Sequence, residues 1–75
     1  MKFDDTLDAV GLLCPLPVLK ARKRLMALQS GQVLRVQADD PAAVIDFPHF
    51  CHEQGHSLIE MVHENGIHVY YLQKH

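Results

Sequence analysis

The chain has 75 residues, which is enough for one domain and too short for two, and we expect a single domain over residues 1–75. Hydrophobic residues make up 48% and charged residues 21%, a composition typical of a globular protein. The formal net charge of −2 argues against a general nucleic-acid-binding surface. No segment is apolar enough to span a bilayer, and Met1–Asp5 lacks the basic and apolar regions of a signal peptide. We expect a cytoplasmic monomer that binds neither membranes nor nucleic acid directly.

The first half of the chain predicts a strand, a helix and a second strand. Phe3 to Val10 is compatible with a strand, although it contains aspartates, which are poor strand formers. From Pro15 to Gln29, apolar residues recur at steps of three and four, the pattern of an amphipathic helix, and Gly31 follows its end. Gln32 to Ala38 alternates between apolar and polar residues, which indicates a strand.

A second helix is predicted after the turn Asp39-Asp40-Pro41, which combines side-chain acceptors with a proline. Its helical pattern runs to Gln54 and is stopped by Gly55. Pro48 interrupts the pattern, so we expect an irregular turn before the regular part of this helix.

The end of the chain predicts a hairpin. The alternating runs Ser57–Glu64 and Ile67–Gln73 are joined by Asn65-Gly66, the strongest short hairpin signal. The complete order is β-α-β-α-β-β. We therefore expect an α/β (α+β) two-layer sandwich, in which a four-stranded mixed sheet carries two helices on one face.

Cys14 lies at the head of the first predicted helix, and we place the N-cap there. The first three helical positions are then Pro15, Leu16 and Pro17. Prolines have no N–H, so two unpaired donors are removed and the N–H of Leu16 is left to point at the sulfur. The helix dipole adds positive charge here, and thiols in such positions have pKa values lowered from about 8.5 to roughly 3.5–7.5. Gly11 supplies the tight backbone that exposes the loop.

Two interpretations of Cys14 are open from these residues alone. The first is a reactive thiolate, whose persulfide anion the same helix start would stabilise. The second is a buried cysteine that acts as a small hydrophobic residue, the commoner role of a single thiol. Two prolines at a helix start are unusual for a core position and favour the reactive interpretation.

The run Leu7-Asp8-Ala9-Val10-Gly11-Leu12-Leu13-Cys14-Pro15-Leu16-Pro17 resembles the signature of the TusA-type, or SirA-like, sulfur carriers. Its core is Cys-Pro-x-Pro preceded by Leu-Asp and Gly-Leu, and Leu16 occupies the variable position. The likeness continues through Asp39-Asp40-Pro41, Phe50-Cys51 and the terminal strand. The resemblance implies a two-layer α/β sandwich and a persulfide on Cys14. It also implies a sulfur-donor protein (a cysteine desulfurase or a rhodanese) and a sulfur-acceptor protein, in tRNA thiolation, molybdenum-cofactor assembly or sulfur oxidation.

The second cysteine, Cys51, is expected in the core beside Phe47 and Phe50, because its helical spacing matches the buried side. Its distance from Cys14 along the chain fits neither a C-x-x-C pair nor a zinc cluster, so both thiols should be free in a reducing compartment. A second sulfur site, or a redox pair with Cys14, is the alternative and would require the two Cα atoms to approach within about 7 Å.

His49, His52 and His56 follow a helical spacing of three and four residues, which could present a zinc or copper site. Gly55 should end the helix before His56, so we expect solvated histidines and no metal. We expect no cofactor either, because no cofactor motif accompanies the cysteine and the chain is too small for a deep cleft.

Basic residues gather on the outer face of the first predicted helix, at Lys20, Lys23 and Arg24. They form either a solvated surface or a docking patch that draws an acidic partner toward Cys14. The sequence predicts a sulfur carrier, or sulfurtransferase, that works through protein partners. The alternative is a regulatory interaction module in which Cys14 only caps the helix.

Overall fold

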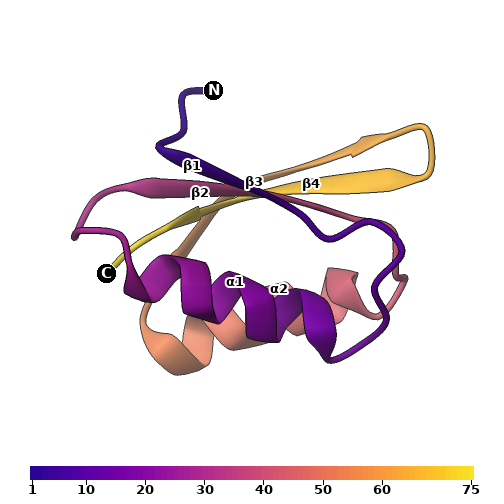
Figure 1. Ribbon diagram of the computed structural model, residues 1–75, viewed down its shortest axis with the longest axis horizontal. Coiled ribbons are helices and arrows are strands. Elements are labelled where there is room, and N and C mark those ends of the chain that lie inside the picture. Colours follow the sequence, from indigo (N-terminus) through magenta and orange to yellow (C-terminus); the bar gives the residue numbers. More distant parts are fainter.

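The computed structural model describes all 75 residues. Its elements are β1 (Asp5–Asp8), α1 (Leu16–Met26), β2 (Val33–Ala38), α2 (Ala43–Gln54), β3 (Ser57–Glu64) and β4 (Ile67–Gln73). The strands form one mixed sheet in the order β1-β2-β4-β3, in which β1 is parallel to β2 and the other pairs are antiparallel. Both helices lie on the same face of this sheet (Figure 1). The predicted two-layer sandwich is therefore confirmed.

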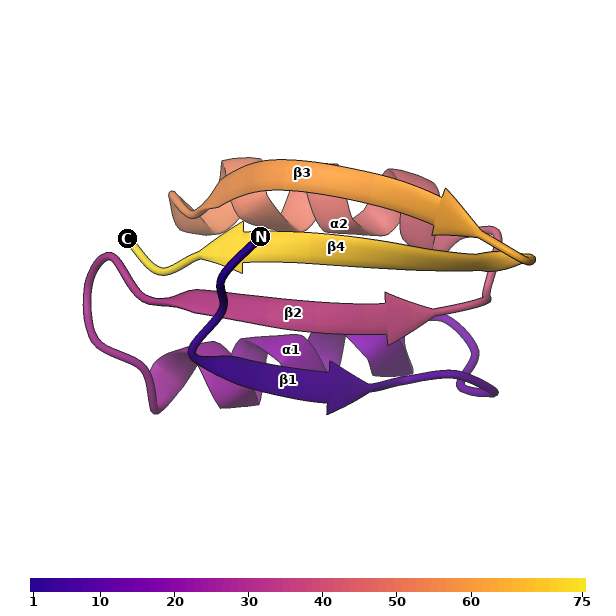
Figure 2. The ribbon, with the colours of Figure 1, turned by 90° about the horizontal axis from the view of Figure 1, so that it is seen from above.

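The core lies between the two helices and the sheet. Seen from the open face of the sheet, α1 lies behind β1 and β2, and α2 lies behind β4 and β3 (Figure 2). Alternate residues of the central strands are fully buried, namely Leu34, Val36, Tyr70 and Leu72. The helices cover them with Ala21, Leu25, Phe47, Phe50 and Cys51. Each large side chain buried in this way contributes about 1.5–3 kcal/mol to folding. No helix has the length and apolar character needed to cross a membrane.

The first strand and the first helix are shorter than the sequence predicted. Strand β1 covers Asp5–Asp8, although the N–H of Ala9 still donates to the carbonyl of Gln37 at 2.7 Å. Helix α1 ends at Met26 because the N–H groups of Ala27 and Leu28 donate to carbonyls three residues earlier in the chain instead of four. The Lys74 ammonium also donates a hydrogen bond to the carbonyl of Leu25 at 2.9 Å.

Pro48 lies inside a continuous α2, so the expected irregular turn before the helix is wrong. The proline removes one backbone hydrogen bond, but its ring is on the exposed side of the helix. The neighbouring residues Phe47, Phe50 and Cys51 stay buried on the other side, and their burial outweighs the lost bond. The helix ends as predicted, at Gly55 in the left-handed conformation with φ 77°.

Candidate functional site

The loop that carries Cys14 and the loop after β2 leave the same end of the sheet, because β1 and β2 are parallel (Figure 2). This is the edge where open α/β sheets bind their ligands. Two carboxylates of the second loop hold the first loop. Asp39 accepts the N–H of Gly11 at 2.9 Å, and Asp40 accepts the N–H of Cys14. Gly11 has φ 85°, which favours glycine, so the loop conformation agrees with the sequence.

The start of α1 differs from the prediction by one residue. Pro15, not Cys14, is the N-cap, and the peptide bond between them is cis. The N–H of Leu16 donates to the carbonyl of Leu13 at 2.9 Å and does not meet the sulfur, because the chain closes a tight turn just before the helix. Pro17 still occupies the first turn, where a missing N–H costs nothing.

The Cys14 thiol is exposed, and the carboxylates of Asp46 and Asp40 act on it. A hydrogen bond to the Asp46 carboxylate keeps the proton on the sulfur and raises the pKa of Cys14. Partial desolvation and the negative charges of Asp46 and Asp40 raise the pKa further. The expected lowering of the pKa of the Cys14 thiol is therefore wrong, because every contribution from its surroundings raises it.

Cys14 opens onto a groove of about 280 Å³ between the start of α1 and the side of α2. The groove is lined by Cys14, Pro15, Val18, Asp46, His49, Phe50 and Glu53. Its four α2 residues follow a spacing of three and four, so they form one stripe along the helix. The acids of this stripe were not predicted as site residues, and their shared helical spacing is the only sequence signal for them.

Lys20 and Lys23 line a separate hollow of about 340 Å³ on the other flank of α1. At 100° per residue they lie roughly 160° and 140° around the helix from Val18, which faces the Cys14 groove. The two hollows share no lining residue. The structure therefore places these lysines and Cys14 on different flanks of the same helix.

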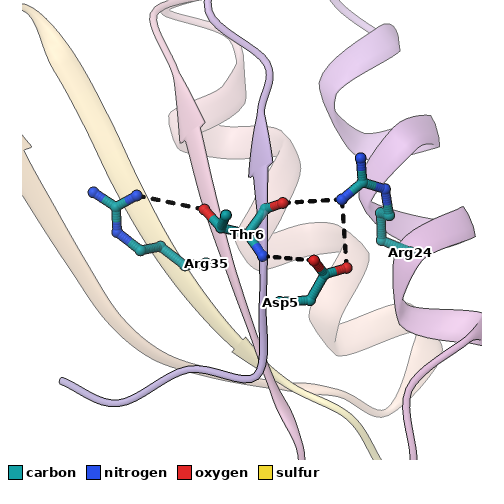
Figure 3. Close-up of polar contacts among 4 residues, drawn as sticks. All are labelled: Asp5, Thr6, Arg24 and Arg35. Carbon is teal, nitrogen blue, oxygen red and sulfur yellow. Dashed lines mark hydrogen bonds and ion pairs between the residues drawn. The ribbon is translucent and has the colours of Figure 1, made fainter.

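Arg24, the third residue of the predicted patch, is held against the first strand (Figure 3). Its guanidinium donates to the carbonyl of Thr6 at 2.9 Å and pairs with Asp5 at 3.4 Å. On the other side of Thr6, the Arg35 guanidinium donates a hydrogen bond to the Thr6 hydroxyl at 3.5 Å. Arg24 thus joins α1 to the edge of the sheet.

Cys51 is buried in the core cluster together with Phe47 and Phe50, as predicted. Burial raises the pKa of its thiol to about 11. The structure therefore contains one exposed thiol and one buried thiol, both free.

The histidines do not form a metal centre, since no group of three or more histidine, cysteine, aspartate or glutamate residues is arranged to hold an ion. His49 lies 3.8 Å from Glu53 across one helical turn. His56 instead accepts the N–H of His75 on Nδ1 at 3.0 Å, and burial, followed by the charges of Lys74 and His75, lowers its pKa.

Fold and site together define a small thiol protein whose single exposed cysteine directly precedes the cap of its first helix. The family model described as Sulfurtransferase TusA matches residues 5–74. The chain therefore belongs to the TusA family of sulfur carriers, also called SirA-like.

The similarity to known relatives extends over most of the chain. It is 53% identical over 64 residues to the sulfur carrier protein TusA of Allochromatium vinosum, covering 85% of this chain and 84% of that one. It is 40% identical over 74 residues to the putative sulfur carrier protein YrkI of Bacillus subtilis, covering 99% of each. The crystal structure of a SirA-like protein from Desulfitobacterium hafniense superposes with a TM-score of 0.83 at 28% identity, over 93% of this chain and 96% of that one.

Proposed function

We propose that this sulfur carrier holds sulfane sulfur as a persulfide on Cys14 and relays it from a donor protein to an acceptor protein. The observation that carries the proposal is the contrast between the two thiols. Cys14 is exposed on a loop that Asp39 and Asp40 hold in place, whereas Cys51 is buried. A thiol that exchanges sulfur with another protein must be accessible and aimed, and only Cys14 is both.

In the loading step, the Cys14 thiolate attacks the outer sulfur of a donor persulfide. A bond forms from Cys14 Sγ to that sulfur while the donor's S–S bond breaks, and the donor cysteine leaves as a thiolate. The proton that Cys14 releases is balanced by the proton that the leaving thiolate takes up, so no separate oxidant or reductant is consumed. Delivery repeats the step with an acceptor thiolate as the nucleophile.

The residues around Cys14 act by shaping its loop. Gly11 makes the left-handed turn, and Pro15 and Pro17 set the start of α1. The N–H of Leu16 is occupied by Leu13, which leaves the N–H of Val18 as the first-turn donor without a backbone acceptor. We infer that this N–H, and not that of Leu16, is the one available to a persulfide anion.

The partners follow from the size of the site. At about 280 Å³ the groove is at the small end of the roughly 300–1,000 Å³ of small-molecule pockets, which supports a partner protein that completes the chemistry. The donor is a cysteine desulfurase or a rhodanese. The acceptor lies in tRNA thiolation, molybdenum-cofactor assembly or sulfur oxidation, and the exchange takes place in the cytoplasm.

Lys20, Lys23 and Arg24 form the docking patch for an acidic surface of such a partner. Arg24 also holds β1, so Lys20 and Lys23 are the residues to change. The variant Lys20→Glu/Lys23→Glu should slow transfer from an acidic donor several-fold. Loading by polysulfide, which needs no docking surface, serves as the reference reaction. Equal rates of donor transfer in the variant and the wild type would remove the patch from the proposal.

The function is tested by intact-mass spectrometry after incubation with thiosulfate and a rhodanese, with cysteine and a desulfurase, or with polysulfide. Wild type and Cys51→Ala should each gain one sulfur atom that a reductant removes. Cys14→Ser should gain none. The proposal fails when no donor loads the wild type, or when Cys14→Ser loads as well as wild type does.

A further inference from the structure

The groove beside Cys14 is acidic, and neither a lysine nor an arginine lines it. Asp46 forms no ion pair within the chain, and Glu53 meets only His49, at 3.8 Å. Asp40, from the loop before α2, adds a third negative charge near the sulfur. The two groove residues that α1 and its cap contribute, Pro15 and Val18, carry no charge.

The two acids on α2 lie at the ends of a partly apolar stretch. Asp46 and Glu53 are seven residues apart on α2, which is about 10 Å along the helix axis. Between them the groove is lined by His49 and Phe50, and α1 contributes Val18. The surface thus offers negative charge at either end and hydrophobic contact in the middle, next to the thiol.

We propose that this groove receives the segment of a partner protein that carries the partner's reactive cysteine, and that this segment is basic and apolar. A lysine or arginine of the segment pairs with Asp46 or Glu53, and an apolar side chain next to its cysteine packs on Phe50 and Val18. The inference rests on the proposed sulfur exchange at Cys14 and names the chemistry of the partner at that same site.

Charge complementarity is the argument for a cationic occupant. An anionic segment would face three carboxylates, whereas a cation would neutralise the one that holds the thiol proton. Because Asp46 raises the pKa of Cys14, a cation beside Asp46 lowers that pKa and favours the thiolate. Docking would therefore activate the nucleophile at the moment its target arrives, and the free protein would keep a less reactive thiol.

The groove and the basic patch are independent surfaces. Lys20 and Lys23 lie on the opposite flank of α1 and favour an acidic surface, while the groove favours a basic segment. The two preferences have opposite signs, so charge-changing variants distinguish them.

The test uses two short peptides, each with a cysteine activated as a mixed disulfide with thionitrobenzoate. One peptide has lysine and phenylalanine beside the cysteine, and the other has glutamate and phenylalanine. The sulfur of Cys14 attacks the peptide sulfur, the S–S bond breaks, and released thionitrobenzoate is measured by its absorbance. Rates are divided by those of the same peptides with 2-mercaptoethanol, which removes intrinsic differences between the peptides.

At low salt the wild type should react about fivefold faster with the lysine peptide, and the preference should shrink as salt is added. Asp46→Asn/Glu53→Gln should react with both peptides at similar normalised rates, and Glu53→Lys, which leaves the same net charge at the groove, should reduce the preference to a similar extent. The matched control Glu60→Gln/Glu64→Gln also removes two negative charges, but from exposed positions of β3, and should keep the wild-type preference.

The proposal is overturned if the wild type shows no charge preference, or if the preference survives in Asp46→Asn/Glu53→Gln. It is also overturned if the β3 control loses the preference equally, because net charge would then be the cause. Loading of the same wild-type sample by polysulfide separates the two claims. Loading without a charge preference contradicts the groove alone, and a charge preference without loading contradicts the sulfur-carrier mechanism alone.

Discussion

Asp40 accepts the backbone N–H of Cys14 across the gap between two loops. The other oxygen of the same carboxylate accepts the N–H of Ala42, just before α2. One side chain therefore fixes the position of the thiol relative to α2, the helix that carries Asp46. Neighbouring Asp39 holds Gly11 in the same way. The Cys14 loop is thus positioned by the residues that follow β2.

The first prediction concerns this connection. Asp40→Asn should lower the free energy of unfolding by about 1 kcal/mol, since asparagine has one acceptor oxygen and can keep only one of the two N–H bonds, which then becomes a neutral one. It should also slow sulfur loading of Cys14 at a pH high enough to ionise the thiol fully, because the sulfur is positioned less well there while the thiolate fraction is the same in both proteins. Urea unfolding and loading kinetics measure the two effects. Glu64→Gln, which alters an exposed acid of β3, is the control and should change neither. An Asp40→Asn protein with wild-type stability and loading would show that the loop is held by other contacts.

Much of the architecture could be predicted because its signals are local. The hairpin turn is an example: Asn65 has φ 50° and Gly66 has φ 80°, the left-handed pair that Asn-Gly favours. The alternation along β2 likewise predicted which of its residues are buried. Pro48 was misjudged because a local rule disfavours proline within a helix, whereas the burial of its neighbours decided the outcome.

The chemistry of the site could be predicted only in part. The exposed position of Cys14 could be predicted, because the glycine and the prolines that shape its loop are close to it in the sequence. The pKa of Cys14 does not, because its main determinant, Asp46, comes from a helix far along the chain. A helix-dipole argument assumes that nothing else approaches the thiol. Here tertiary packing brings carboxylates to it and reverses the direction of the shift.

The second prediction concerns the effect of Asp46 on the pKa of Cys14. In Asp46→Asn the hydrogen-bonding carboxylate and its charge are gone, so the pKa of Cys14 should move down toward its ordinary value. The thiolate fraction at pH 7 rises accordingly, and alkylation by the neutral reagent iodoacetamide should be several-fold faster. The rate measured against pH should show its midpoint at lower pH than in the wild type. Glu60→Gln, on β3, is the matched control and should leave the midpoint in place. A higher midpoint in Asp46→Asn would contradict the assigned role of this carboxylate.

The third prediction concerns the buried thiol. The pKa of Cys51 is raised to about 11 in the folded protein, above its value in the unfolded chain, because burial disfavours the thiolate. The neutral thiol's contribution is therefore fully present below about pH 9 and lost as the pH rises toward 11. The loss should amount to about 2 kcal/mol. Urea unfolding at a series of pH values measures it, and Cys51→Ala should remove most of the decline between pH 9 and 11. An equally steep decline in Cys51→Ala would assign the effect to other groups.

The last prediction concerns Tyr70, whose hydroxyl is buried without a hydrogen-bond partner. Its ring packs on Phe47 with centroids 4.5 Å apart, and both side chains are completely buried. A buried hydroxyl without a partner costs free energy that a phenylalanine in the same place avoids. Tyr70→Phe should therefore raise the free energy of unfolding, by up to about 1 kcal/mol, in contrast to most core substitutions.

Tyr71→Phe, at the neighbouring half-buried position of β4, is the matched control and should leave the free energy of unfolding nearly unchanged. The same variants test the pH dependence. Burial, together with the charges of Asp40 and Asp46, raises the pKa of Tyr70 to about 12, so ionisation of this group leaves the stability unchanged below about pH 10 and lowers it as the pH rises toward 12. Tyr70→Phe should therefore also flatten the decline in stability above pH 10. A clear destabilisation by Tyr70→Phe at neutral pH would show that the hydroxyl does have a partner, for which the carboxylates of Asp40 and Asp46 are the nearest candidates.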